Sequence, residues 1–224
     1  MVVGHLALAL AAKRVAPRIN LGWLMAGVTA LDLVWPILVL AGVERVSIVP
    51  GATAFNALVF DYYPWSHSLL MALVWGIVLA GFARAADVPR SAAPLLILLV
   101  MSHWVLDVIT HAPDMPLWPG RSPHLGLSLW DSITGTFVVE GLLWVAGIAI
   151  YLRSHRIDGL GRRIAFWSLV VVMTAGWASS PWSPPPGSAR QLALFALIGW
   201  IIIPWSAWAD GGRETRDAAG VQSA

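Results

Sequence analysis

Residues 92–110 read AAPLLILLVMSHWVLDVIT, an apolar run in which the only ionisable side chains are His103 and Asp107. A helix that crosses a membrane needs about 20 mainly apolar residues, so this run is long enough to span. Across all 224 residues, 58% are hydrophobic and 12% are charged, whereas soluble domains carry about 25% charged residues. A domain of this size cannot bury so much apolar surface, which excludes a soluble globular protein and a disordered chain.

Further apolar runs on both sides of this segment predict the fold class: all-α, a polytopic integral membrane helical bundle. The six predicted spans are residues 21–42, 68–83, 92–110, 133–152, 164–178 and 191–208. Residues 2–12 are apolar but too short to cross, and the basic residues follow this run instead of preceding it as in a signal peptide. We therefore predict an N-terminal half-membrane helix that packs against the protein.

The predicted spans divide the chain into three parts. Residues 1–152 form a membrane-embedded helical domain, residues 153–209 add two further transmembrane helices, and residues 210–224 are a polar tail that we expect to be disordered.

The basic residues give the predicted orientation in the membrane. Eleven of the 14 lie in loops or in the tail on one side of the predicted spans, and the other side holds only Arg45, Arg121 and Arg190. The positive-inside rule makes the basic side cytoplasmic, together with the C-terminus. The excess of basic residues is therefore a topology signal, and no patch for nucleic acid is apparent.

Ionisable side chains within the predicted spans are costly and therefore informative. His103 and Asp107 lie four residues apart, so they share one face of a helix. The other members of this set come from three further segments, at a depth that we expect to be similar: His5, Asp32 and His67. Imidazole and carboxylate ligands without thiolate favour zinc or another first-row divalent ion. The other interpretation of His103 and Asp107 is a polar contact within or between helices.

A second polar set is weaker. Ser132, Thr136 and Glu140 recur at helical spacing, and we read Glu140 as a packing residue more readily than as a ligand. Asp131 and Asp61 are candidate general bases for a reaction beside the metal.

The order His5, Asp32, Ser66-His67-Ser68 and His103-x-x-x-Asp107 resembles that of bacterial inner-membrane proteins named metal-dependent hydrolases. Those proteins are distantly similar to zinc-dependent phospholipase C and to the single-strand-specific zinc nucleases. The resemblance covers residues 1–150. It implies one metal held by four residues: Asp32, His67, His103 and Asp107. It also implies that His5 contributes to a neighbouring metal, with Asp107 as a bridge.

The chain departs from the patterns of these proteins at three informative places. Tyr62-Tyr63 stands where the membrane proteins often have His-Arg, and Leu31 replaces the usual Pro before Asp32. The soluble enzymes also use a His-x-x-x-Glu pair, and here Thr136 occupies the position of that histidine. We therefore expect one or two zinc ions instead of three.

The expected function is a metal-dependent hydrolase that acts on a phosphoester or lipid at the outer face of a bacterial cytoplasmic membrane. Its partners would be a membrane lipid or lipid-linked substrate, and other membrane proteins. The alternative is a non-catalytic subunit or scaffold of a larger membrane complex, in contact with a cofactor or pigment. A transporter ranks third, because we find no inverted repeat and the polar residues gather on one side.

Overall fold

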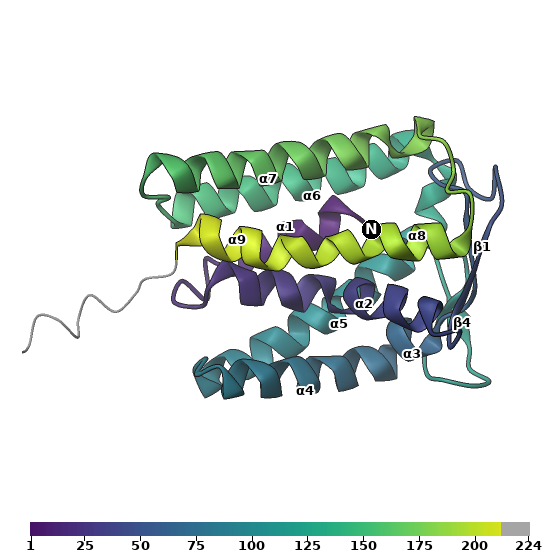
Figure 1. Cartoon of the computed structure of the whole chain (residues 1–224), viewed down its shortest axis with the longest axis horizontal. Helices are drawn as coiled ribbons and strands as arrows, with labels where there is room; N and C mark the ends of the chain where they lie inside the picture. Colours follow the sequence, from purple (N-terminus) through teal and green to yellow (C-terminus); the bar gives the residue numbers. More distant parts are fainter. Residues whose placement is uncertain (212–224) are drawn as a thin grey trace, which may run out of the picture.

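The computed structural model describes residues 1–211 as a bundle of helices that run mostly along its longest axis (Figure 1). The main helices are α1 (Val3–Ala12), α2 (Leu21–Leu40), α4 (Leu69–Ala85), α5 (Ala93–Thr110), α6 (Ile133–Ser154), α7 (Leu160–Ser179), α8 (Ala189–Ala196) and α9 (Ile202–Asp210). Short helical turns complete them: α3 (Pro64–His67), η1 (Arg90–Ala92), η2 (Leu129–Asp131), η3 (Ser180–Trp182) and η4 (Leu197–Ile201).

Five helical segments are long and apolar enough to cross a membrane, which agrees with a helical membrane protein. These segments are Leu21–Leu40, Arg90–Thr110, Ile133–Ser154, Leu160–Trp182 and Ala189–Asp210. The sixth predicted span corresponds to α4, which is a shorter apolar helix of 17 residues. The count of six therefore stays a prediction.

Large apolar side chains cover the outside of the bundle. The exposed side chains include Leu142 and Val145 on α6, Val171 on α7, Phe195 on α8 and Ile198 on η4. Patches of this kind are rare on soluble proteins, but they suit helices whose neighbours are lipid chains.

Helix α1 lies inside the bundle and begins near the middle of its length (Figure 1). It packs chiefly on α6 and α2, and most of its residues are buried. The contact with α6 depends on Gly147, because a Cβ atom there would lie 2.6 Å from the carbonyl oxygen of Ala7. The predicted half-length helix packed against protein is therefore present.

Two short antiparallel strand pairs lie at one end of the bundle, which we call the strand end. They are β1 (Arg45–Ile48) with β2 (Leu58–Tyr62), and β3 (Met115–Pro116) with β4 (His124–Leu125). In the first pair Arg45 stands opposite Tyr62, and Ser47 opposite Val59. These strands are not among the elements predicted from the sequence. In β1 and β2 the aromatic and β-branched residues favour extended backbone.

The opposite end of the bundle, which we call the tail end, is held together by one buried ion pair. Lys13 Nζ lies 2.5 Å from Asp210 Oδ2, and Tyr151 donates a hydrogen bond to Asp210 Oδ1. Asp210 also accepts from the backbone N–H of Leu21, so four helices meet at this carboxylate. We expected the disordered tail to start at Asp210, but this residue ends α9 and is buried. The rest of the predicted tail, 212–224, lies outside the described residues.

Candidate metal centre

The five residues predicted as metal ligands converge from four separate segments. His5 comes from the first turn of α1, Asp32 from the middle of α2, and His67 from the end of α3. His103 and Asp107 follow one another on α5 by one helical turn. We call these five side chains the His/Asp cluster.

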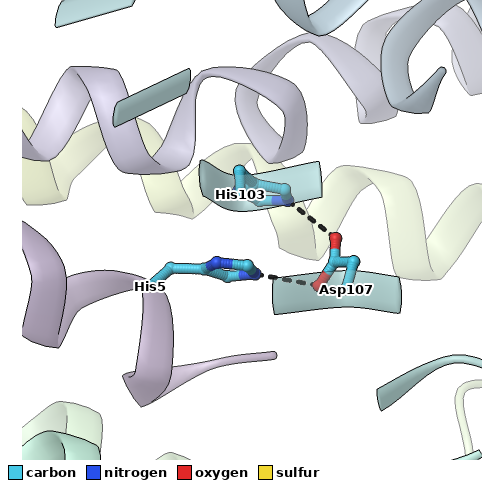
Figure 2. A group of neighbouring side chains, drawn as sticks. All are labelled: His5, His103 and Asp107. Atoms are coloured by element: carbon cyan, nitrogen blue, oxygen red, sulfur yellow. Dashed lines mark hydrogen bonds and ion pairs between the residues drawn. The ribbon is translucent and has the colours of Figure 1, made fainter. Parts of the chain in front are cut away.

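Asp107 lies close to both His5 and His103 (Figure 2). Its Oδ1 atom lies 3.0 Å from His5 Nε2, and its Oδ2 atom lies 3.0 Å from His103 Nε2. The rings of His5 and His103 are stacked, with centroids 3.7 Å apart. All three side chains are buried, so their polar atoms need partners within the protein.

A second group shares His103 with the first. His67 Nε2 lies 3.5 Å from Asp32 Oδ1, and His103 Nε2 lies 3.7 Å from the same oxygen. His67 Nε2 is also 3.9 Å from Asp107 Oδ2. In each group the ligand atoms lie within 4.8 Å of one another, a spacing that can hold a metal ion.

A backbone carbonyl group determines which ring nitrogen of His103 carries the proton. Its Nδ1 atom lies 2.6 Å from the carbonyl oxygen of Val28. A carbonyl oxygen only accepts, so Nδ1 carries the proton and Nε2 of the neutral ring presents a lone pair. Nε2 is buried and has no hydrogen-bond partner among the described residues, although Asp107 is close.

His67 is oriented in the same way by a chain of two side chains. Ser66 Oγ donates to Glu44 Oε2 at 2.6 Å, so it accepts from His67 Nδ1 at 2.7 Å. Glu44 Oε1 accepts two backbone N–H groups, from Trp65 and Ser66, each at 2.8 Å. Burial raises the pKa of the Glu44 carboxyl, against the hydrogen bonds from Ser66, which lower it. The chain leaves His67 Nε2 free on the side of Asp32.

These proton positions fit a bound cation. When both rings are neutral, two imidazole lone pairs face the oxygens of two carboxylates, and acceptors that face each other repel unless a positive charge lies between them. Nitrogen and oxygen donors suit zinc, and the N–H···O bonds behind each ring are the outer contacts usual for metal-binding histidines. Alternatively, protons on both Nε2 atoms would form hydrogen bonds to the carboxylates. A measurement of bound metal distinguishes the metal-bound state from this protonated state.

The His/Asp cluster is closed on most sides and open at Asp32. The Asp32 side chain is 52% exposed, whereas those of the other four members are 4% exposed or less. Asp32 lies eight residues before the end of α2, so the opening is about 12 Å below that end. Asp32 is therefore the member of the cluster that is accessible from outside the bundle.

Glu140 has a role that the sequence did not reveal. It is buried on α6, and its Oε2 atom accepts from the backbone N–H groups of Val2 and Gly4 at 2.8 and 3.3 Å. The Met1 nitrogen lies 2.5 Å from Asp107 Oδ1. Glu140 thus fixes the first turn of α1, which carries His5, because a carboxylate satisfies the free N–H groups there.

The two candidate general bases belong to neither metal-sized group. Asp61 lies on β2 and accepts from Ser47 Oγ, and Asp131 is exposed at the end of η2. Their role as bases stays a prediction.

His111, just after α5, is buried beside Tyr63. The Tyr63 hydroxyl donates to Asp114 Oδ1 at 2.6 Å, and His111 Nδ1 lies 3.1 Å from the same oxygen. Burial raises the pKa of the Tyr63 hydroxyl well above its usual range, so it remains a donor at neutral pH. The Tyr63 ring also lies 5.4 Å from that of His67, centroid to centroid, so this group adjoins the His/Asp cluster.

Glu44 and Ser66 also escaped the sequence reasoning. Ser68 caps α4 by accepting from Met71 N–H. Ser66 does not cap this helix, and its hydroxyl contacts His67 instead. The sequence signal for this support is Glu44, an acidic residue just after the predicted span 21–42. Arg45 is its only basic neighbour in residues 43–66.

The fold and the His/Asp cluster together define a helical membrane protein with a histidine–aspartate centre among its helices. Comparison with protein-family models, with curated proteins and with solved structures gives no match to this chain. The function must therefore be argued from the site itself.

Proposed function

We propose that this chain is a membrane-embedded metal-dependent hydrolase that binds one or two zinc ions in the His/Asp cluster. Its substrate would be a phosphoester or lipid, taken from the outer face of a bacterial cytoplasmic membrane. The observation that supports the proposal is the convergence of three imidazoles and two carboxylates, with the Nε2 atoms of His67 and His103 beside carboxylate oxygens.

The cluster contains two groups of three residues, and each group would hold one ion. His5, His103 and Asp107 would hold one ion, and Asp32, His67 and His103 a second. When bound, such an ion lowers the pKa of a water molecule and polarises a phosphoryl or acyl oxygen. The hydrogen bonds from His103 to Val28 and from His67 to Ser66 keep both rings oriented before substrate arrives.

The burial of the cluster supports a lipid substrate. Four of its members lie inside the bundle, and the exposed Asp32 belongs to a helix long and apolar enough to span a membrane. A lipid with its ester bond near the headgroup could approach this depth from the bilayer, while the buried side excludes bulk water. The larger number of basic residues at the tail end supports a cytoplasmic position for that end, which puts the cluster in the outer half.

Activity is tested on the full chain reconstituted with zinc in vesicles of phosphatidylethanolamine and phosphatidylglycerol. The measured products are diacylglycerol, released phosphorylated headgroup and free fatty acid. We expect turnover by the wild type and by His124→Ala, a control that removes an exposed histidine from β4. We expect chelation or His103→Ala to abolish it.

Turnover that survives both chelation and His103→Ala would overturn a metal-dependent reaction at this site. Stoichiometric zinc without turnover on any lipid tested would overturn the hydrolase and favour the non-catalytic subunit.

A further inference from the structure

A groove at the strand end lies outside the His/Asp cluster. It has a volume of about 820 Å³ and runs between the end of α2, strands β1 and β2, and the start of α8. None of the five cluster residues lines this groove. Figure 1 shows α8 beside the last turns of α2 at this end.

Two arginines line the groove, Arg45 from β1 and Arg190 from α8. Within the described residues neither guanidinium lies within 4 Å of a carboxylate, and neither makes a hydrogen bond through its side chain. Arg45 lies over the ring of Tyr62, 5.1 Å from its centroid. Each guanidinium therefore keeps its donors available for an anion.

Two acids also line the groove, and among the described residues neither forms a direct ion pair with an arginine. Asp61 accepts from Ser47 Oγ at 2.6 Å, and Glu44 is buried against Ser66. The groove therefore presents two cationic groups whose charge is not met by a direct ion pair. Guanidinium groups bind phosphate well because two N–H donors match two phosphate oxygens.

Apolar side chains line the groove as well. Leu40 at the end of α2 and Leu194, one turn after Arg190 on α8, are both exposed there. Both belong to segments long and apolar enough to span a membrane, so these leucines lie where the lipid region ends. A free phosphate ion would leave these leucines uncovered, and an uncharged lipid would leave the arginines unused.

We propose that this groove binds an anionic phospholipid, with the phosphate on Arg45 and Arg190 and an acyl chain along Leu40 and Leu194. The proposal does not rest on metal binding or on hydrolysis, because the groove and the His/Asp cluster share no residue. It gives the protein a fixed lipid contact at the strand end.

The test uses the full chain in detergent, titrated with dihexanoyl phosphatidylglycerol and with dihexanoyl phosphatidylcholine, and bound lipid counted by native mass spectrometry. We expect phosphatidylglycerol to bind more tightly. Replacing either arginine should weaken phosphatidylglycerol binding about fivefold. The double variant Arg45→Gln with Arg190→Gln should therefore weaken this binding on the order of 25-fold. Arg121→Gln is the control, because Arg121 is exposed in the loop between β3 and β4 and does not line the groove.

Two further measurements separate a lipid from free phosphate and from the metal site. Leu194→Asn should weaken phosphatidylglycerol binding, and excess inorganic phosphate should not displace the lipid. His103→Ala should leave lipid binding unchanged, so failure of the hydrolase proposal remains distinguishable from failure of this one. Equal binding of both lipids, or wild-type binding by the double arginine variant with an unchanged melting temperature, would overturn the proposal.

Discussion

At the residue scale, the Ser66 hydroxyl determines which nitrogen of His67 is free. Because Ser66 donates to Glu44, it can only accept from His67 Nδ1, and Nε2 is left for a metal. Ser66→Ala removes this fixed proton position, so we expect zinc affinity to fall 10–100-fold, as is typical of outer contacts to metal ligands. Zinc competition with a fluorescent chelator measures the change.

The matched control for this variant is Ser102→Ala. Ser102 precedes His103 on α5, but its hydroxyl donates to the carbonyl of Leu99 and not to the cluster. It should therefore bind zinc like the wild type. Equal losses in both variants would mean that Ser66 acts through general stability and not through His67.

The sequence predicted the members of the His/Asp cluster better than the residues that orient them. Spacing on a helix pairs His103 with Asp107, and similar depth in separate spans adds His5, Asp32 and His67. Glu44 and Ser66 meet only because the segment between α2 and α4 folds back on itself. No local pattern reports a contact of that kind, since it depends on tertiary structure.

At the element scale, α1 brings His5 to the cluster, and its position depends on a close approach to α6. Gly147→Ala would place a Cβ atom 2.6 Å from the Ala7 carbonyl oxygen, which forces the two helices apart. We expect a loss of about 1–3 kcal/mol in stability from overpacking, together with weaker zinc binding. Thermal unfolding in detergent measures the first effect.

Gly81→Ala is the control for that variant. Gly81 lies on α4, and nothing lies within 4 Å of a Cβ atom built there. Alanine favours helix over glycine, so this variant should unfold at the wild-type temperature or slightly above it. A loss equal to that of Gly147→Ala would contradict the role given to the helix contact.

The tail end depends on the ion pair of Lys13 and Asp210. Asp210→Ala leaves the buried Lys13 ammonium without its carboxylate, and Tyr151 loses its acceptor. We expect a loss of about 3–5 kcal/mol, the range for breaking a buried ion pair from one side. The melting temperature should recover partly when Lys13→Met is added, because the unpaired charge is then gone.

Asp158→Ala serves as the comparison for the ion pair, because Asp158 is exposed in the loop between α6 and α7. A change within about 0.5 kcal/mol is expected there. If Asp210→Ala were equally mild, the buried ion pair would not be a main contact between the helices.

The elements themselves were predicted unevenly. Long apolar runs gave most of the helices, because length and hydropathy alone decide whether a segment can span a membrane. The two strand pairs were not predicted, since such short strands owe their pairing to the helices that bring the loops together. The buried end of α9 was missed because Asp210 looks polar until its partner Lys13, far away in the sequence, is known.

At the scale of the whole molecule, the orientation in the membrane can be tested directly because the chain contains no cysteine. Ser183→Cys lies at the strand end and Ser91→Cys at the tail end, and both serines are exposed. In intact bacterial cells that express the chain, a membrane-impermeant maleimide should label Ser183→Cys only. Ser91→Cys should react after permeabilisation, and the reverse pattern would contradict the positive-inside argument.

The central claim is that the His/Asp cluster holds a metal, and the zinc content of the purified full chain tests it most directly. Elemental analysis should find one or two zinc ions per wild-type chain and the same number in the exposed-histidine control His124→Ala. His103 belongs to both metal-sized groups, so His103→Ala should lose most of the zinc while remaining folded. Wild-type protein that binds no stoichiometric zinc or other divalent metal, even after incubation with zinc, would contradict the claim.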